Sequence, residues 1–317
     1  GMNNRSQKTK GKFLGEGTLL LMTILWGATF VIVKESLSDI STMLFVTLRF
    51  GLAGLILFLI LFFKKHKVVN ESILPGIFLG SLLFLGFFTQ TVGLKFTSAT
   101  KSGFITGSLV VMVPLFQTLI EKKFPTKGAQ IGTVLVFIGI LFLSNGGSSI
   151  NNFLGELGAN FNFGDGMTLA CAVFYALHIV YIDIISSKHD YWILLTTQIV
   201  TVAVLSLATS FFLAGFSIEP LHISFTSYLI FGILYTAICA TLITIGIQTK
   251  FQKVVSPTKA GIIYSFESIF AAIFAFFLLN EKITNFGLVG SILIFLGLIS
   301  SEVIDSFFEK KNGNSTG

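Results

Sequence analysis

Apolar residues fill ten long stretches of this chain, and short polar segments separate them. Most stretches approach the roughly 20 residues that a helix needs to cross the hydrocarbon core of a bilayer. They predict an all-α polytopic membrane protein with ten transmembrane helices. The expected spans are 17–37, 43–63, 74–94, 103–121, 128–144, 164–182, 192–214, 225–247, 258–279 and 284–302.

The ten stretches form two sets of five that resemble each other. A shift of 149 residues superimposes Trp26 on Tyr175 and Arg49 on Gln198, and a shift of 158 superimposes Gln90 on Gln248. An odd number of spans in each copy inserts the second copy upside down, which is the architecture of many secondary carriers. The predicted organisation is a tail (1–12), a first repeat (13–144), a hinge loop (145–163), a second repeat (164–302) and a second tail (303–317).

Composition and charge agree with a membrane location. Only 11% of the residues are charged, the mean hydropathy is +0.86, and 36 residues are Phe. Sixteen Lys and Arg fall in one set of connecting segments and tails, and four fall in the other set. This asymmetry predicts that both termini are cytoplasmic and that loop 145–163 is extracytoplasmic. The first apolar run is too long for the core of a signal peptide and no A-x-A-like site follows it, so we expect an uncleaved first span. The charge asymmetry also assigns the net charge of +6 to lipid headgroups and not to nucleic acid.

Several segments carry a family resemblance. The runs LWGATFVIVKESL (25–37), LRFGLAG (48–54) and FGDGMTLACAVFYALHIVYID (163–183) resemble the drug/metabolite transporter superfamily in its EamA-like branch. The resemblance extends from about residue 17 to 302. It implies ten helices, cytoplasmic termini and transport of small polar metabolites, often the export of amino acids or related compounds. Ser268 departs from the pattern, because many relatives carry Pro at that position.

Two ionisable residues within the spans are the main candidates for substrate contact, since such groups are costly in a membrane. Glu267 is expected near the midplane, where its carboxylate would bind a substrate ammonium or carry a proton. The alternative is a packing role through a hydrogen bond to a neighbouring helix. Arg49 would hold a substrate carboxylate, or else it pairs with Glu267 or caps helix carbonyls.

The remaining candidates are polar or aromatic. Tyr264 shares a helix face with Glu267. His178 would titrate during transport or form a packing hydrogen bond. Lys34 would serve the path or extend to the headgroups. Glutamines and an aromatic pair would line the path or pack helices together: Gln90, Gln198, Gln248, Trp26 and Tyr175.

The sequence therefore predicts a secondary transporter of a bacterial inner membrane, working by alternating access around a cavity lined by the first, third, fourth, sixth, eighth and ninth spans. It predicts no enzyme, cofactor or metal site, and Gly15-Glu16-Gly17 lacks the third Gly of a nucleotide-binding motif. Expected partners are a small-molecule substrate, a coupling proton or cation, and lipids, with a monomeric chain. The alternatives are a phosphate-linked antiporter of the sugar-phosphate or nucleotide-sugar type and a non-transporting sensor.

Overall fold

The computed structural model describes residues 2–143 and 161–313, so most of the predicted hinge loop lies outside the described residues. Within these ranges the chain is helical, and the extended pairing is one isolated bridge between Ile40 and Ile223. The helices of the first half are α1 (Met2–Ser36), α2 (Thr42–Lys64), η1 (Asn70–Ser72), α3 (Ile73–Phe96), α4 (Ala99–Gly107), α5 (Leu109–Glu121) and α6 (Lys127–Leu143).

The second half repeats this order of elements. Its helices are α8 (Phe163–Ser186), α9 (Tyr191–Gly215), α10 (Ser227–Ala237), η3 (Ile238–Ile243), α11 (Thr244–Phe251), η4 (Gln252–Val254), α12 (Pro257–Tyr264), α13 (Phe266–Leu279) and α14 (Asn285–Gly313).

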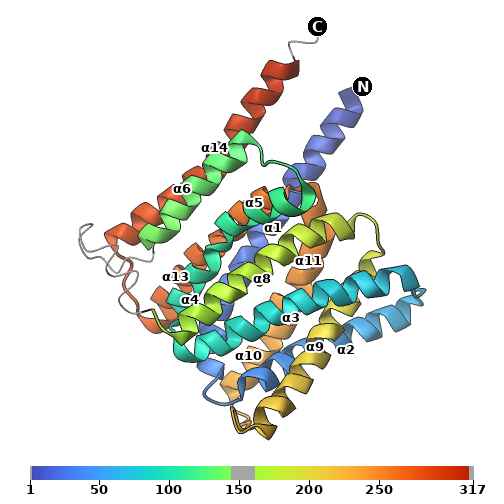
Figure 1. The fold of residues 1–317 in the computed structure, drawn as a ribbon, viewed down its shortest axis with the longest axis vertical. Helices are drawn as coiled ribbons and strands as arrows, with labels where there is room; N and C mark the ends of the chain where they lie inside the picture. Colours follow the sequence, from blue (N-terminus) through green and yellow to red (C-terminus); the bar gives the residue numbers. More distant parts are fainter. Residues whose placement is uncertain (1, 144–160, 314–317) are drawn as a thin grey trace.

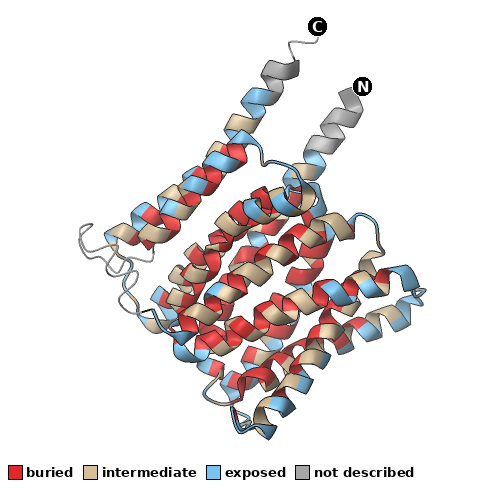
Figure 2. Ribbon diagram, viewed as in Figure 1, coloured by how far each residue is buried: buried red, intermediate tan, exposed pale blue. Residues whose placement is uncertain are grey.

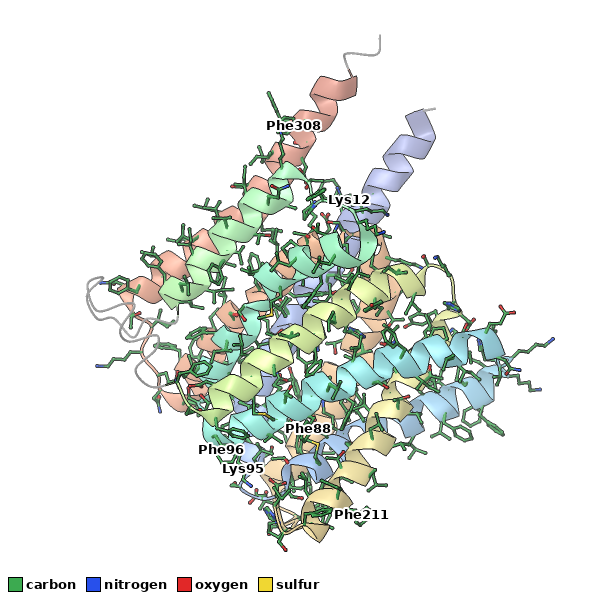
Figure 3. The ribbon with its side chains drawn as sticks, viewed as in Figure 1. Lys12, Phe88, Lys95, Phe96, Phe211 and Phe308 are labelled. Carbon is green, nitrogen blue, oxygen red and sulfur yellow. The ribbon has the colours of Figure 1, made fainter. Side chains whose placement is uncertain are left out.

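The helices have the length and surface of membrane-spanning segments. In the described ranges, nine helices or continuous helical runs are long and apolar enough to cross a bilayer, and α6 is a shorter apolar helix of 17 residues. Large apolar side chains cover the periphery, including Phe96 and Phe211, whereas the buried residues concentrate in the centre (Figures 2 and 3). The predicted helical membrane fold is confirmed. The count of ten spans stays a prediction, because it requires α6 to cross as well.

The helices of the two repeats interleave. The most extensive contacts pair α6 with α14, α3 with α8, and α2 with α9, and α1 packs against α13 (Figure 1). Glycines allow the closest approaches. A Cβ on Gly139 would lie 2.7 Å from the carbonyl oxygen of Gly290, and a Cβ on Gly132 would lie 2.8 Å from that of Gly297. Each half therefore packs largely against the other half.

Two spans are interrupted at matching places. The fourth span breaks at Ser108, between α4 and α5, and the ninth breaks at Ser265, between α12 and α13. Serine side chains start both spans, because Ser98 accepts from the amide of Lys101 (3.1 Å) and Ser256 accepts from that of Lys259 (3.3 Å). The Ser268 hydroxyl donates to the Gly103 carbonyl (3.0 Å), so this residue ties α13 to α4.

The molecule has two ends along its helices. Lys12 and the first and last described turns lie toward one end, which we call the terminal end, and Lys95 and Phe96 lie toward the other, which we call the opposite end (Figures 1 and 3). The α4 helix starts at the opposite end, directly after α3. The α12 helix starts at the terminal end, directly after α11 and η4. The fourth and ninth spans are thus antiparallel.

Candidate functional site

A central cavity lies between the two repeats, about halfway along the spans. Counted as the space open to the centre of a water molecule, its volume is about 50 Å³. Because one water needs roughly 10–15 Å³ by this measure, the cavity holds only a few waters in this conformation. Its lining residues are Trp26, Thr29, Arg49, Leu83, Phe87, Gln90, Leu109, Tyr175, His178, Ile179, Ile245, Gln248, Tyr264 and Glu267.

Most of the residues expected from the sequence converge on this cavity, and two do not. Gln198 is fully buried behind the wall, where its Oε1 lies 2.9 Å from Nε2 of His178. The Lys34 ammonium lies at the opposite end and donates to the carbonyls of Leu94 (2.5 Å) and Lys95 (3.4 Å). The lining also includes Arg49 from the second span, which was not among the six expected spans.

Glu267 contributes a carboxylate to the cavity from the first turn of α13. Among the described residues, no side chain or amide hydrogen-bonds to it, and no cationic group lies within 4.0 Å. The side chain is only partly buried because it faces the cavity space. A carboxylate in such a position is costly unless water or a ligand solvates it.

Arg49 faces the same cavity, and hydrogen bonds to a neighbouring helical segment fix its guanidinium. Its Nε donates to the hydroxyl of Thr241 (2.7 Å), and one terminal nitrogen donates to the carbonyl of Ala240 (3.0 Å). The guanidinium carbon lies 4.7 Å from the ring centre of Phe87. Both oxygen partners belong to η3, a π-helical segment, and such segments concentrate at functional sites. The sequence carries no signal for this π-helical turn, so Thr241 was not expected.

Aromatic rings and side-chain amides form much of the remaining wall. The rings of Trp26 and Tyr264 meet edge to face with centroids 5.6 Å apart. The Tyr175 hydroxyl donates to Oε1 of Gln90 (3.2 Å), and Nε1 of Trp26 donates to the Ala240 carbonyl (3.2 Å). The repeat mates Trp26 and Tyr175 thus both reach the cavity through hydrogen-bonded rings.

The sequence pattern also does not predict the role of a second buried residue, Gln252. Oε1 of Gln252 accepts from Gln248 (2.9 Å) and from the Tyr264 hydroxyl (2.8 Å), and its amide donates to the Ile179 carbonyl (2.6 Å). Gln252 therefore fixes two lining residues without lining the cavity itself. It stands next to a helix end in the sequence, where a Gln is usually exposed, and nothing there marks it as buried.

A larger crevice lies beside the central cavity. It separates α4 and α13 from the α6–α14 pair, is mostly apolar, and has a volume of about 800 Å³ by the same measure. None of the residues expected from the sequence lines it. Within the described residues, no group of three or more His, Cys, Asp or Glu is placed to hold a metal ion.

The fold and the cavity define a helical, multi-pass membrane protein of two repeats with a small central cavity between them, onto which Glu267 and Arg49 face. Two segments of the chain, residues 13–145 and 162–301, match the EamA-like transporter family. The chain belongs to this family.

Curated proteins similar to this chain are also named as transporters. An "Uncharacterized transporter" of Archaeoglobus fulgidus is 32% identical over 89% of this chain and 83% of its own length. "Uncharacterized transporter YoaV" of Bacillus subtilis is 27% identical over 88% and 94%. "Uncharacterized inner membrane transporter YedA" of Escherichia coli K12 is 26% identical over 44% and 47%. A solved crystal structure with 14% identity covers 90% of this chain and 96% of its own at a TM-score of 0.71, which shows the shared fold.

Proposed function

We propose that this protein is a secondary transporter that moves a small zwitterionic metabolite, an amino acid or a related compound, by alternating access. The observation that carries the proposal is that Glu267 and Arg49 line the same cavity. One side chain is a carboxylic acid and the other a guanidinium, and they do not form an ion pair with each other. A ligand that has both an ammonium and a carboxylate would solvate the two groups at once.

The chemistry of each group favours this ligand. A carboxylate that lacks a protein partner gains most from a cation in a cavity of low dielectric. A guanidinium forms strong, directional hydrogen bonds to a carboxylate. The rings of Trp26, Tyr175 and Tyr264 offer an apolar wall for the side chain of the ligand.

The setting of the protein completes the proposal. The distribution of Lys and Arg supports cytoplasmic termini, and one relative is named an inner membrane transporter, so we place the protein in a bacterial inner membrane. Export is the expected direction, as the family resemblance implies. Glu267 is the expected carrier of a coupling proton or cation, because it is the ionisable carboxylate on the cavity lining.

Transport in proteoliposomes tests the function. We expect the purified protein to exchange radiolabelled amino acids from a mixed panel across the membrane, with a rate that depends on an imposed proton or sodium gradient. Glu267→Gln should lower this rate at least tenfold, because the neutral amide no longer attracts the ammonium. Lys282→Gln, which changes an exposed residue outside the cavity, is the matched control and should transport normally.

The outcomes separate the alternatives. Exchange of sugar phosphates or nucleotide sugars, with no amino acid transport, would replace the proposal with a phosphate-linked antiporter. Binding of an amino acid, seen as a thermal shift, without flux would indicate a sensor. Normal amino acid transport by Glu267→Gln at every pH would remove the role assigned to this residue.

A further inference from the structure

Two ion pairs connect the repeats. Their residues correspond to each other under the same shifts of 149 and 158 residues that superimpose the two repeats. Lys101 in α4 pairs with Asp165 in α8 (Nζ to Oδ2, 2.5 Å), and Lys259 in α12 pairs with Glu16 in α1 (Nζ to Oε1, 3.0 Å). The two lysines are 158 residues apart and the two acids are 149 residues apart. In each pair, the acid comes from one repeat and the lysine from the other.

The local surroundings of the pairs also match. The acids stand in Gly15-Glu16-Gly17 and Gly164-Asp165-Gly166. The first glycine of each motif allows a tight crossing, because a Cβ on Gly164 would lie 2.6 Å from the Gly93 carbonyl oxygen, and a Cβ on Gly15 would lie 2.5 Å from Val254. The lysines occupy the third position of α4 and of α12, each after its capping serine. Gly15-Glu16-Gly17, which lacks the third Gly of a nucleotide-binding motif, therefore has a counterpart in the second repeat.

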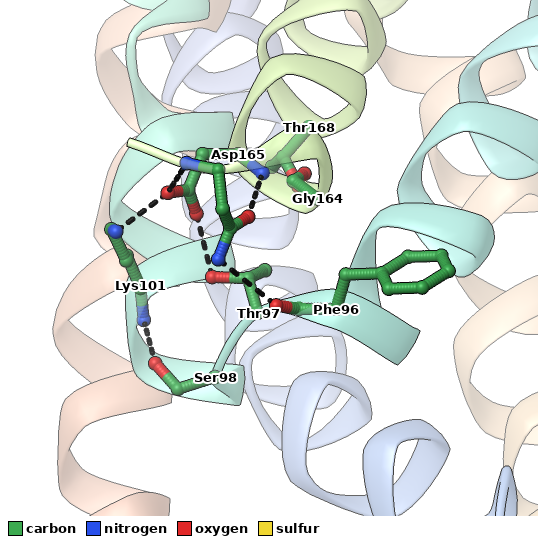
Figure 4. Close-up of polar contacts among 8 residues, drawn as sticks. Phe96, Thr97, Ser98, Lys101, Gly164, Asp165 and Thr168 are labelled. Carbon is green, nitrogen blue, oxygen red and sulfur yellow. Dashed lines mark hydrogen bonds and ion pairs between the residues drawn. The ribbon is translucent and has the colours of Figure 1, made fainter. Parts of the chain in front are cut away.

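The two pairs lie at opposite ends of the cavity. Asp165 is at the opposite end of the molecule, where it also accepts from the hydroxyl of Thr97 (2.6 Å) and the amide of Asn162 (2.9 Å) (Figure 4). Ten residues separate Asp165 from Tyr175 along α8, and ten separate Glu16 from Trp26 along α1. At 1.5 Å per residue, each pair lies about 15 Å along its helix from the cavity wall, in opposite directions.

We infer that these pairs are alternating latches. Each latch joins a span that begins a repeat to the fourth or ninth span, and holds its own end of the cavity closed. Opening one end separates its lysine from its acid while the other pair stays formed. Both pairs are formed in this structure, in which the cavity holds only a few waters. This inference rests on the proposed alternating access, and it adds the residues that govern it.

The two latches differ in exposure. The Lys101 side chain is 37% exposed, whereas those of Lys259 and Glu16 are 5% and 12% exposed. Water weakens an exposed ion pair, while breaking a buried pair leaves an uncompensated charge. Asp165 is 0% exposed, but it keeps the hydrogen bonds from Thr97 and Asn162 when the lysine leaves, so the end that holds Lys101 opens more readily than the terminal end.

Accessibility of the cavity from each side tests the latches. Cys171 and Cys239 are replaced by Ala, and Thr29→Cys in the cavity lining serves as the reporter. A membrane-impermeant maleimide is then applied to right-side-out and inside-out vesicles. We expect Lys101→Gln to speed labelling at least fivefold from the side of the opposite end. Glu16→Gln should do the same from the side of the terminal end.

Controls separate latching from general damage. Lys101→Gln leaves the Asn162–Asp165 cap intact. Lys101→Arg, which keeps the positive charge opposite Asp165, should label as slowly as the parent protein. Lys95→Gln is the matched control, because it removes an ion pair with Glu219 (2.8 Å) at the same end, and among the described residues the repeat mate Lys253 forms no matching ion pair. Its labelling should match the parent protein.

The result also distinguishes this inference from the proposed function. The latches would be overturned if Lys101→Gln and Glu16→Gln elute as single species in size-exclusion chromatography and are labelled at the parental rate from both sides. This outcome does not depend on what the protein transports. Side-specific labelling as expected, together with no amino acid transport, would leave the latches standing and overturn the assigned substrate.

Discussion

At the scale of single residues, the arginine of the cavity depends on a backbone irregularity. Arg49 is aligned by the Thr241 hydroxyl and the Ala240 carbonyl, both presented by the π-helical segment. A lysine has one ammonium group and cannot make both contacts while also facing a ligand.

We therefore predict that Arg49→Lys loses recognition of the substrate carboxylate although it keeps the charge. A lost charge-assisted hydrogen bond costs about 1.5–3 kcal/mol, which is a factor of roughly ten to one hundred in affinity. The measurement compares the KM for amino acids with the KM for the corresponding amino acid amides. The parent should discriminate between acid and amide, and the variant should not. Equal discrimination by both proteins would count against a carboxylate contact.

Glu267 and Arg49 also show which properties of single residues can be predicted from the sequence. Both are ionisable residues in apolar spans, and the cost of exposing them to lipid predicts that they face a common interior. The sequence could not predict which neighbours hold them. Thr241 depends on a π turn that no residue pattern marks, and Gln198 turns to His178 instead of the cavity because the rotation of α9 is set by packing.

At the scale of elements, crossings between the repeats depend on glycine pairs. Gly139 and Gly290 bring α6 and α14 so close that neither backbone tolerates a side chain from the other. The sequence shift that matches Gly132 with Gly290 and Gly139 with Gly297 reveals a two-fold related crossing. The shift alone could not show that these two helices are partners.

We predict that Gly139→Leu destabilises the protein by forcing the α6–α14 pair apart. Overpacking of this kind costs about 1–3 kcal/mol, which corresponds to a thermal midpoint lower by at least roughly 3 °C. A thermal unfolding assay in detergent checks the effect. Gly51→Leu is the matched control, because a side chain there meets no neighbour within 4 Å. A variant as stable as the control would show that the crossing is not tight.

At the scale of the whole molecule, the orientation in the membrane follows from charge distribution. The sequence predicts both tails in the cytoplasm, and the structure places the first and last described turns at the same end (Figure 1). Fluorescent protein fused after residue 317 should therefore be fluorescent, and alkaline phosphatase inserted after Ser217 should be active. Inactive phosphatase at Ser217 together with active phosphatase at the C-terminus would reverse the orientation.

The interleaving of the repeats leads to another prediction at this scale. Two separately encoded chains, residues 1–150 and 151–317, should restore transport when they are produced together. Each chain alone should be degraded, because its principal helix partners belong to the other repeat. Pulse-chase labelling of each half, alone and together, measures this difference. Long survival of one half by itself would contradict it.

This interleaving also bears on how the protein is made. The first five helices leave the ribosome before their partners exist, so Arg49 and Lys101 enter the bilayer without the residues that neutralise or align them. The nascent first half must wait, in the insertion machinery or among lipids, until the second half arrives. The later-synthesised half thus acts as an intramolecular chaperone for the earlier one, and translation rate becomes a determinant of yield.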